Sequence, residues 1–372
     1  MRIGIDARMY GPKQAGLGRY IQKLLENLVE IDSENEYVIF LKEDNFNLFE
    51  TKNPKFKKVL ADIHWYGKGE QLLFPKIIKK EGVDLMHFPH WNVPLFYRAP
   101  FVVTIHDLIL LHYPNRRAST LNPVLYFLKY IFFRIILWHA TNNSKKIITV
   151  SKFVKNDLIK TSKVKQEKIV VTYEASLEKI GGADKSVLEK YNITKPFVMY
   201  VGNAFPHKNL EMLVKSWKFF IEKYSKNYQL VLVGKENYFY KRLQKEVEKY
   251  NDKNLSESIK ITGFVPDEEL SQLYKKCGLY VFPSLYEGFG IPPLEAMQYG
   301  VPVVSSDRSC MPEILEDAAN YFDPENYQEM AKVIYKNLTN KEERKKLQEN
   351  SKRVLKKYSW KKMVEETIEI YK

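Results

Sequence analysis

Short apolar runs alternate with helix-length segments along the first half of the chain. The runs are rich in β-branched and aromatic residues, which suits short buried strands. They occupy residues 3–7, 37–41, 85–88, 101–105 and 146–150. Between the first two runs, the residue pattern predicts a loop from Gly11 to Gly18 and an amphipathic helix over residues 19–29. Such alternation of strands and helices predicts a parallel sheet.

The same pattern restarts after a polar stretch at residues 178–185. Further strands are predicted over residues 197–201, 230–233, 259–262, 279–282 and 301–305. We therefore expect two doubly wound, Rossmann-like α/β domains, 1–177 and 178–359, followed by an amphipathic helix over 360–372. Ligands of such sheets bind at the carboxyl ends of the strands, so the two domains are expected to face one another across a binding cleft.

One apolar stretch, residues 122–139, fits more than one environment. Two basic residues interrupt it, whereas a transmembrane helix needs about 20 nearly uncharged residues, so we do not expect it to span a membrane. One alternative is a helix buried in the core. The other is a helix partly in the core and partly against a membrane surface, with Tyr126, Tyr130 and Trp138 as interfacial residues.

The net charge of +14 is concentrated in the first half of the chain, where residues 1–175 hold 27 Lys and Arg against 17 Asp and Glu. An anionic lipid leaflet, a diphosphate-bearing lipid or nucleic acid would suit such a field. A simpler explanation is that lysines keep the protein soluble. The chain has no RNA-binding aromatic motif, zinc finger or dense basic tract, so nucleic acid is not an expected partner.

The two cysteines, Cys277 and Cys310, lack the spacing of metal ligands and give no disulfide framework. The chain begins on a predicted strand, without the apolar segment of a signal peptide. Both observations favour a cytoplasmic protein. The basic first half allows it to be peripheral on the cytoplasmic face of a membrane.

Candidate chemistry is concentrated in Ser284-Leu-Tyr-Glu-Gly-Phe-Gly-Ile-Pro-Pro-Leu-Glu295, which follows a predicted strand. Gly288 and Gly290 allow the backbone to approach a ligand, and the two prolines suit the first turn of a helix. The unpaired N–H groups of a helix start can hold a phosphate, while Glu287 and Glu295 accept hydrogen bonds from sugar hydroxyls. We therefore interpret this segment as a clamp for a phosphorylated, polyhydroxylated ligand.

The structural alternative is that Glu295 only balances the dipole of its helix and that Glu287 is a solvated loop residue. The surrounding residues favour a functional role, because Glu-Gly-Phe-Gly-x-Pro-x-Leu-Glu-Ala-Met-x-x-Gly-x-Pro-Val-Val resembles the donor-site signature of glycosyltransferase family 4. Seven residues separate the two glutamates, as in that family. The resemblance implies a GT-B architecture, with donor contacts from Glu287, Gly288, Phe289, Gly290, Ile291 and Glu295.

A second stretch, Val201-Gly-Asn-Ala-Phe-Pro-His-Lys208, also leads from a predicted strand end toward a helix. It resembles the phosphate-binding segment of the family, which commonly reads Gly-Arg-x-x-x-x-Lys. The resemblance implies that Gly202, Asn203 and Lys208 contact the donor and that Lys208 offsets the charge growing on a departing nucleotide diphosphate. The alternative is a solvated surface lysine.

Asn203 departs from the family pattern, because arginine is usual at this position. Asparagine donates hydrogen bonds but carries no charge, so another cation could be required. Arg19 is a candidate, since it follows the predicted loop containing Gly16 and Gly18, which would face the diphosphate.

His106 follows a predicted strand end in the first domain. The resemblance implies that it contacts the transferred sugar, with Asp107 available to orient it, whereas its position alone also suits a structural histidine in a turn. The resemblance further places the backbone of Phe264 and Val265 beside the nucleotide base. Residues 88–92 are interpreted as an acceptor-side loop.

No metal site is expected. His87 and His90 have a spacing that two metal ligands could use, but the sequence offers no convincing third ligand. The chain also contains no Asp-x-Asp motif, which argues against a divalent metal holding the diphosphate. We expect a metal-independent enzyme with no cofactor other than its nucleotide-sugar cosubstrate.

The resemblance implies a retaining hexosyltransferase with His106, Lys208 and Glu287 as catalytic residues, whose helix 360–372 packs back on the first domain. The opening Ile-Asp-Ala-Arg-Met-Tyr-Gly-Pro segment is similar to bacterial mannosyltransferases of surface-polysaccharide and lipopolysaccharide assembly. That similarity favours GDP-mannose as donor and a saccharide or lipid-linked saccharide as acceptor. The alternatives are a UDP- or dTDP-sugar donor, a nucleotide-sugar epimerase or hydrolase of the same fold, and a non-catalytic membrane or nucleic-acid adaptor.

Overall fold

The chain forms two compact units. The computed structural model describes residues 1–114, 122–179, 186–250 and 252–372. The first unit contains Met1–Glu174 and Ser359–Lys372, and the second contains Ala175–Tyr358. The division therefore falls between residues 174 and 175, a few residues before the boundary at 177/178. Of the polar stretch 178–185, residues 180–185 lie outside the described residues.

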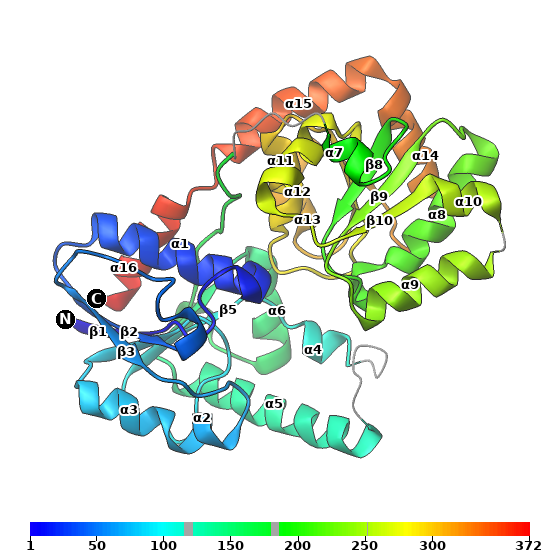
Figure 1. The fold of residues 1–372 in the computed structure, drawn as a ribbon. Helices are drawn as coiled ribbons and strands as arrows, with labels where there is room; N and C mark the ends of the chain where they lie inside the picture. Colours follow the sequence, from blue (N-terminus) through cyan, green and yellow to red (C-terminus); the bar gives the residue numbers. More distant parts are fainter. Residues whose placement is uncertain (115–121, 180–185, 251) are drawn as a thin grey trace. The chain divides into compact units, whose positions relative to one another are not determined.

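The first unit is built on a parallel sheet of seven strands in the order β3-β2-β1-β4-β5-β6-β7 (Figure 1). Ile3 of the inner strand β1 pairs with Tyr37 on one side and Leu85 on the other. The strands are β1 Arg2–Asp6, β2 Glu36–Leu41, β3 Phe56–Leu60, β4 Leu85–Phe88, β5 Phe101–Ile105, β6 Lys146–Thr149 and β7 Ile169–Val171. Helices cover both faces of the sheet, which explains why its inner strands are continuously apolar.

The helices of this unit include the last helix of the chain, α16, which packs against α1 through an edge-on contact between Tyr20 and Trp360. Near its end, the Tyr371 hydroxyl lies 2.6 Å from Nδ1 of His87. The helices are α1 Ala15–Ile31, α2 Lys68–Leu72, α3 Phe74–Glu81, α4 Ile109–His112, α5 Pro123–Asn143, α6 Lys152–Ser162 and α16 Trp360–Tyr371.

The second unit has a parallel sheet of six strands in the order β10-β9-β8-β11-β12-β13. The strands are β8 Phe197–Val201, β9 Gln229–Val233, β10 Ile259–Gly263, β11 Leu279–Phe282, β12 Val303–Ser306 and β13 Ala319–Phe322. The helices are α7 Val187–Lys190, α8 Leu210–Lys223, α9 Tyr238–Lys249, α10 Lys253–Ser258, α11 Asp267–Lys276, α12 Ile291–Gln298, α13 Met311–Leu315, α14 Tyr327–Thr339 and α15 Lys341–Leu355.

Both sheets reverse the direction of strand addition at one point. The reversal lies between β1 and β4 in the first unit and between β8 and β11 in the second. Loops at the carboxyl ends of the two strands that flank such a switch point form the usual ligand site of doubly wound sheets. The predicted fold class, two doubly wound parallel α/β sheets, is confirmed, and the topology indicates where each unit would bind a ligand.

The predicted loop at Gly11–Gly18 is wrong at its end, because α1 begins at Ala15 and includes Gly16 and Gly18 in its first turn. Gly18 packs directly on the preceding turn: a Cβ atom there would lie 2.0 Å from the carbonyl oxygen of Gly11. The glycine at position 18 therefore serves a close backbone approach within the first unit.

The apolar stretch 122–139 lies in α5, and the expectation that this helix is simply buried in the core is wrong. Only one stripe, at helical spacing, is covered: Phe133, Ile136, Leu137, His139, Ala140 and Thr141. Within the described residues, α5 alone is long and apolar enough to cross a membrane, by length and composition only. Eight large apolar side chains on α5 are exposed: Val124, Leu125, Phe127, Leu128, Ile131, Phe132, Ile135 and Trp138.

Candidate active site

Two loops are joined at the switch point of the second sheet, one after β8 and one after β11. The backbone N–H of Leu285 donates to the carbonyl of His207 at 2.7 Å. The side-chain amide of Asn209 donates to the carbonyls of Pro283, at 3.2 Å, and Pro324, at 2.8 Å. These bonds hold the β8 loop beside the β11 loop.

The joined loops bring together two of the predicted site residues. Nζ of Lys208 donates to Oε1 of Glu287 at 2.6 Å, and only 16% and 10% of the two side chains are exposed. The backbone N–H of Glu287 donates to the hydroxyl of Ser309 at 3.1 Å, which fixes the loop on its other side. Charge-assisted bonds of this kind are shorter and stronger than neutral ones, so the pair presents a preoriented cation at the sheet edge.

The turn between the two glutamates requires a glycine at position 290. Gly290 has φ +86°, and a Cβ atom there would lie 2.4 Å from Cε of Met311. Gly288 and Ile291 flank this turn, and α12 begins at Ile291. Phe289 is 3% exposed and its ring makes an edge-on contact with Tyr358, with centroids 5.5 Å apart, so it supports the loop from within.

Glu295 lies just past the first turn of its helix. It is the fifth residue of α12 and accepts a hydrogen bond from the hydroxyl of Tyr274 at 3.2 Å. Charge effects of a helix dipole fall off within the first turn, so dipole compensation is a poor explanation for this glutamate. Its distance from the helix start also separates it from the unpaired N–H groups that were expected beside it.

Tyrosine hydroxyls hold the turn that contains Gly202 and Asn203. Tyr240 donates to the carbonyl of Gly202 at 2.8 Å, and Tyr200 donates to the carbonyl of Asn203 at 2.9 Å. A Cβ atom at position 202 would lie 2.6 Å from the Tyr200 hydroxyl, which explains the glycine. Arg19, the suggested replacement for the missing arginine, is partly buried on α1 of the first unit.

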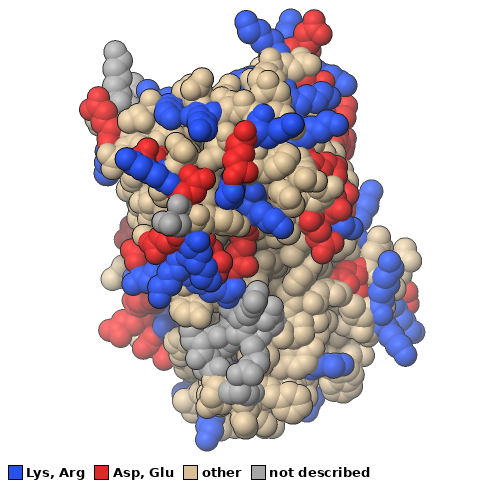
Figure 2. All heavy atoms as spheres, turned by 90° about the vertical axis from the view of Figure 1, so that its right-hand side faces the viewer, with Lys and Arg blue, Asp and Glu red and all other residues tan. Residues whose placement is uncertain are grey.

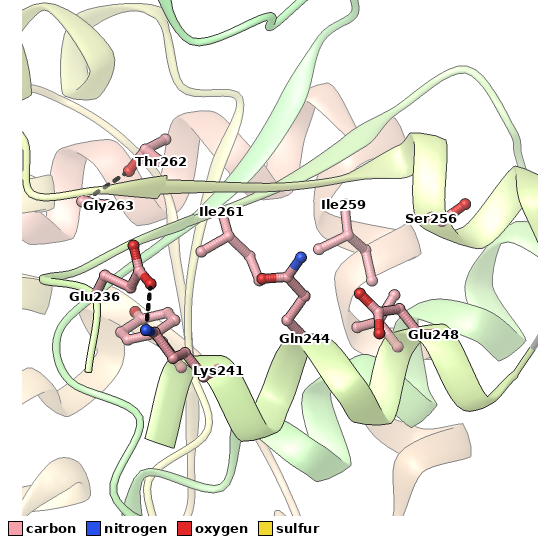
Figure 3. A pocket seen from close by; sticks show the side chains of 11 residues that line it. Glu236, Lys241, Gln244, Glu248, Ser256, Ile259, Ile261, Thr262 and Gly263 are labelled. Atoms are coloured by element: carbon pink, nitrogen blue, oxygen red, sulfur yellow. Dashed lines mark hydrogen bonds and ion pairs between the residues drawn. The ribbon is translucent and has the colours of Figure 1, made fainter. Parts of the chain in front are cut away.

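A hollow of about 390 Å³ lies between α9 and the edge strand β10 (Figure 3). It ends at Gly263, and the next two residues are Phe264, 71% exposed, and Val265, which is buried. Lys208, Glu287 and Glu295 do not line this hollow, so it adjoins the turn predicted to meet the base and is separate from the ion pair. Its lining includes Glu236, Lys241, Gln244, Glu248, Ile259, Ile261 and Thr262.

In the first unit, His106 directly follows β5 and is engaged through both ring nitrogens. Nδ1 lies 3.0 Å from Oε1 of Glu174, and Nε2 lies 2.9 Å from the carbonyl oxygen of Pro89. The edge of the Tyr20 ring packs on it, with centroids 4.6 Å apart. Because each ring nitrogen faces an acceptor oxygen, a hydrogen bond to each acceptor requires a proton on that nitrogen. Glu174 takes the orienting role suggested for Asp107, and nothing in the sequence near either residue signals this pairing.

The charge state of His106 follows from these partners. Burial alone would lower the pKa of His106, but the hydrogen bond and charge of Glu174, with smaller contributions from Pro89 and Asp107, outweigh it and raise the pKa above 6.5. The ring is therefore expected to be cationic over a wider pH range than an ordinary histidine.

We expect Glu174→Gln to lower the pKa of His106, because burial then dominates. A raised folded-state pKa stabilises the fold fully below the unfolded value of 6.5, and this contribution is lost as pH rises through the folded-state pKa. The stability difference between the wild type and Glu174→Gln should therefore shrink with increasing pH in this window. Histidine ring NMR titration and urea unfolding at several pH values measure both effects, and a His106 pKa that the substitution leaves unchanged would contradict the assignment.

A buried ion network closes the carboxyl end of β1. Arg8 is 2% exposed and donates from Nε and Nη2 to the two oxygens of Asp6, at 2.8 and 2.7 Å. The same Nη2 donates to Glu70 at 2.7 Å, and Glu70 is fully buried. The guanidinium stacks on the Phe74 ring at 4.0 Å. The Ile-Asp-Ala-Arg motif thus fixes the carboxyl end of β1, one of the two strands that flank the switch point of the first sheet.

Comparisons with known proteins agree with this architecture. Residues 15–175 match the family model of Glycosyltransferase Family 4, and residues 185–354 match that of Glycosyl transferases group 1. The chain is 31% identical to the O-antigen chain mannosyltransferase RfbU of Salmonella typhimurium over 268 residues, which is 72% of this chain and 68% of that protein. It is 29% identical to O-antigen chain mannosyltransferase B of Escherichia coli, over 77% of this chain and 74% of that one.

The fold has a close counterpart among solved structures. Anabaena HepE, solved in complex with UDP and glucose, superposes with a TM-score of 0.75 over 100% of this chain and 99% of that chain, at 17% sequence identity. Two doubly wound sheets, matches to both family models and 31% identity to a relative over most of its length together decide the classification. The chain belongs to glycosyltransferase family 4 and has the GT-B fold of that family.

Proposed function

We propose that this glycosyltransferase transfers mannose from GDP-mannose, with retention of the anomeric configuration, to a saccharide or lipid-linked saccharide in cell-surface polysaccharide synthesis. The observation that carries the proposal is the Lys208–Glu287 pair at the switch point of the second sheet. The choice of mannose is supported by two relatives that are O-antigen chain mannosyltransferases. The second unit would bind the donor and the first would bind the acceptor.

In this proposal Lys208 steadies the negative charge that grows on the leaving diphosphate as the glycosidic bond to the donor sugar breaks. Glu287 keeps the lysine oriented before the donor arrives, and Glu295 accepts hydrogen bonds from sugar hydroxyls. The acceptor hydroxyl gives its proton to the leaving phosphate, so no side chain is needed as a covalent nucleophile. His106, oriented by its hydrogen bond to Glu174, would position the transferred sugar if its ring exchanges the Pro89 carbonyl for a sugar oxygen.

The test is a transfer reaction with GDP-mannose and a panel of p-nitrophenyl glycosides as acceptors. The proposal predicts an α-linked mannoside, identified from the one-bond carbon–proton coupling at its anomeric centre. A β-linked product would contradict retention. Release of free mannose at the same rate with and without an acceptor would favour a hydrolase of the same fold. Transfer only from UDP- or dTDP-sugars would show that the donor is not GDP-mannose.

We further propose that transfer needs no divalent metal. Support comes from Lys208, which supplies a cation where the diphosphate would lie. Within the described ranges, no group of three or more His, Cys, Asp or Glu side chains is placed to hold a metal ion. Adding EDTA should leave the initial rate of mannosyl transfer unchanged, and a rate that is abolished by EDTA and restored by Mg²⁺ or Mn²⁺ would contradict the proposal.

We also propose that the enzyme is peripheral on an anionic membrane surface through the exposed apolar face of α5. Trp138, 63% exposed, and the basic residues Lys129 and Arg134 on the same helix suit the interface between lipid headgroups and acyl chains. Figure 2 is in keeping with this, because its lower end, at the height of α5 in Figure 1, carries few charged side chains. The excess of positive charge in residues 1–175 favours an anionic leaflet over a second copy of the chain.

Vesicle flotation tests this localisation. At low salt the wild type should float with phosphatidylglycerol vesicles and much less with phosphatidylcholine vesicles. Replacing Ile131 and Ile135 together by Glu should abolish flotation, because each would place a carboxylate in the apolar face. Leu60→Glu, at a leucine on the edge strand β3 that is somewhat more exposed than either isoleucine, is the control. Equal flotation of the wild type and the double variant would contradict the proposal.

A further inference from the structure

Aromatic side chains gather where the loops after β3 and β4 meet in the first unit. Tyr66, from the loop between β3 and α2, stacks on Trp91 of the β4 loop, with ring centroids 5.3 Å apart and an interplanar angle of 21°. The Tyr66 hydroxyl lies 2.9 Å from Nε2 of His90. We call these three residues, Tyr66, His90 and Trp91, the aromatic platform. Its outer member, Tyr66, is 49% exposed.

The platform is held in a conformation that a tyrosine does not adopt without support. Tyr66 has φ +62°, in the left-handed region that is rare for bulky residues. Its backbone N–H donates to Oε2 of Glu70 at 2.8 Å, and Oε1 of Glu70 accepts from the side-chain amide of Asn92 at 2.7 Å. The same carboxylate is paired with Arg8. Strain maintained in this way by a buried network is concentrated at ligand sites.

The platform packs on a helix of the same unit and follows a strand at the switch point, where doubly wound sheets usually bind ligands. The Trp91 ring is 9% exposed and makes an edge-on contact with Phe133, with centroids 4.7 Å apart. The loop that carries His90 and Trp91 follows β4, one of the two strands that flank the switch point of the first sheet. A rigid, half-exposed aromatic ring is thus presented at the ligand-binding edge.

The polar groups around the platform are close to His106. Burial and, second, the charge of His106 lower the pKa of His90 to about 3, so His90 is neutral at physiological pH. Burial, the charge of Glu70 and then that of Asp107 raise the pKa of Tyr66. The platform itself therefore carries no net charge and places the Tyr66 hydroxyl, held by His90, at the edge of an apolar ring face.

We infer that the aromatic platform binds one sugar ring of the acceptor saccharide, an inference that rests on the proposed glycosyl transfer. The C–H face of a pyranose is apolar and packs on an aromatic ring, while its hydroxyls exchange hydrogen bonds with polar groups at the ring's edge. A neutral platform suits an uncharged sugar ring better than a phosphate or a carboxylate. The ring at position 66 thus determines acceptor affinity, and donor affinity does not depend on it.

The test uses the full chain and methyl glycosides of mannose, glucose, galactose and N-acetylglucosamine as probes. Binding is measured by saturation-transfer NMR and by the change in tryptophan fluorescence, to which Trp91 contributes. We expect at least one glycoside to bind and Tyr66→Gly to weaken it about tenfold. Glycine adopts the positive φ without strain, so this variant should keep the backbone conformation of the loop. Phe96→Ala, at a 61% exposed ring outside the platform, is the control.

Titration with GDP-mannose in the same samples separates the two proposals. Unchanged donor binding in Tyr66→Gly, together with weakened glycoside binding, supports the platform. Glycoside affinity that is equal in the wild type and Tyr66→Gly, or glycoside binding to neither while the donor still binds, overturns the platform and leaves the proposed transfer standing. Failure of the donor to bind to any of the proteins would count against the proposed transfer itself.

Discussion

Replacing Lys208 by Ala is expected to lower kcat for mannosyl transfer about 100-fold, because it removes one preorganised contact to the charge that develops on the leaving diphosphate. In the structure this lysine is already oriented, with Nζ 2.6 Å from Oε1 of Glu287 and little exposed surface. A contact that strengthens as charge develops lowers the barrier more than it lowers the binding energy of the substrate. We therefore expect kcat to fall more than the donor KM rises, which initial-rate kinetics with GDP-mannose can measure.

The control is Lys332→Ala, at an exposed lysine on α14 of the same unit, which should retain the wild-type kcat. Lys208→Arg keeps the positive charge but changes the shape of the donor group, so it should recover part of the lost rate. If Lys208→Ala and Lys332→Ala have equal rates, Lys208 is a structural partner of Glu287 and takes no part in the reaction.

Replacing Arg8 by Met is expected to destabilise the first unit by about 3 to 5 kcal/mol, because it leaves two carboxylates buried without their cation. Asp6 and Glu70 both depend on this guanidinium, and all three side chains are buried. Urea unfolding followed by tryptophan fluorescence should show a lower midpoint. Since the chain has two units, the transition of the first unit has to be resolved separately.

Arg2→Met is the matched control, because Arg2 also pairs with two carboxylates, Glu36 and Glu81, but at the surface. Surface pairs contribute about 0 to 1 kcal/mol, so this variant should unfold nearly as the wild type does. Restoring the balance of charge in the double variant Arg8→Met/Glu70→Leu should recover part of the lost stability. Equal shifts for Arg8→Met and Arg2→Met would show that the buried network contributes no more than a surface pair.

The inner strands of both sheets could be predicted from the sequence and the outer ones largely could not. Inner strands such as β2 and β9 are covered on both faces and therefore form uninterrupted apolar runs. Three strands were missed, and each lies at the edge of a sheet. There, charged or mixed residues, as in β3 and β13, and very short strands, as the three-residue β7, are tolerated and help to prevent pairing with other chains. The missed strands are β3 (Phe-Lys-Lys-Val-Leu), β7 (Ile-Val-Val) and β13 (Ala-Asn-Tyr-Phe).

The candidate site, too, could be predicted from the sequence only in part. Lys208 and Glu287 lie within family-like motifs that follow predicted strands, so their placement at one sheet edge could be foreseen, although their direct pairing across 79 residues could not. Glu174 reaches His106 across 68 residues from a segment with no motif. The position of the Tyr66 ring depends on a positive backbone φ and on the hydrogen bond from its N–H to Glu70, and neither leaves a pattern in the sequence.

The claim that the Lys208–Glu287 edge of the second unit holds a nucleotide sugar is tested most directly by isothermal titration calorimetry. The wild type, Glu295→Ala and Lys332→Ala would each be titrated with GDP-mannose, UDP-glucose and a dTDP-sugar in the presence of EDTA. We predict that GDP-mannose binds the wild type and Lys332→Ala with equal affinity, more tightly than the other donors, and that Glu295→Ala binds it more weakly. Absence of binding to every nucleotide sugar, or equal donor affinity in all three proteins, would contradict the account.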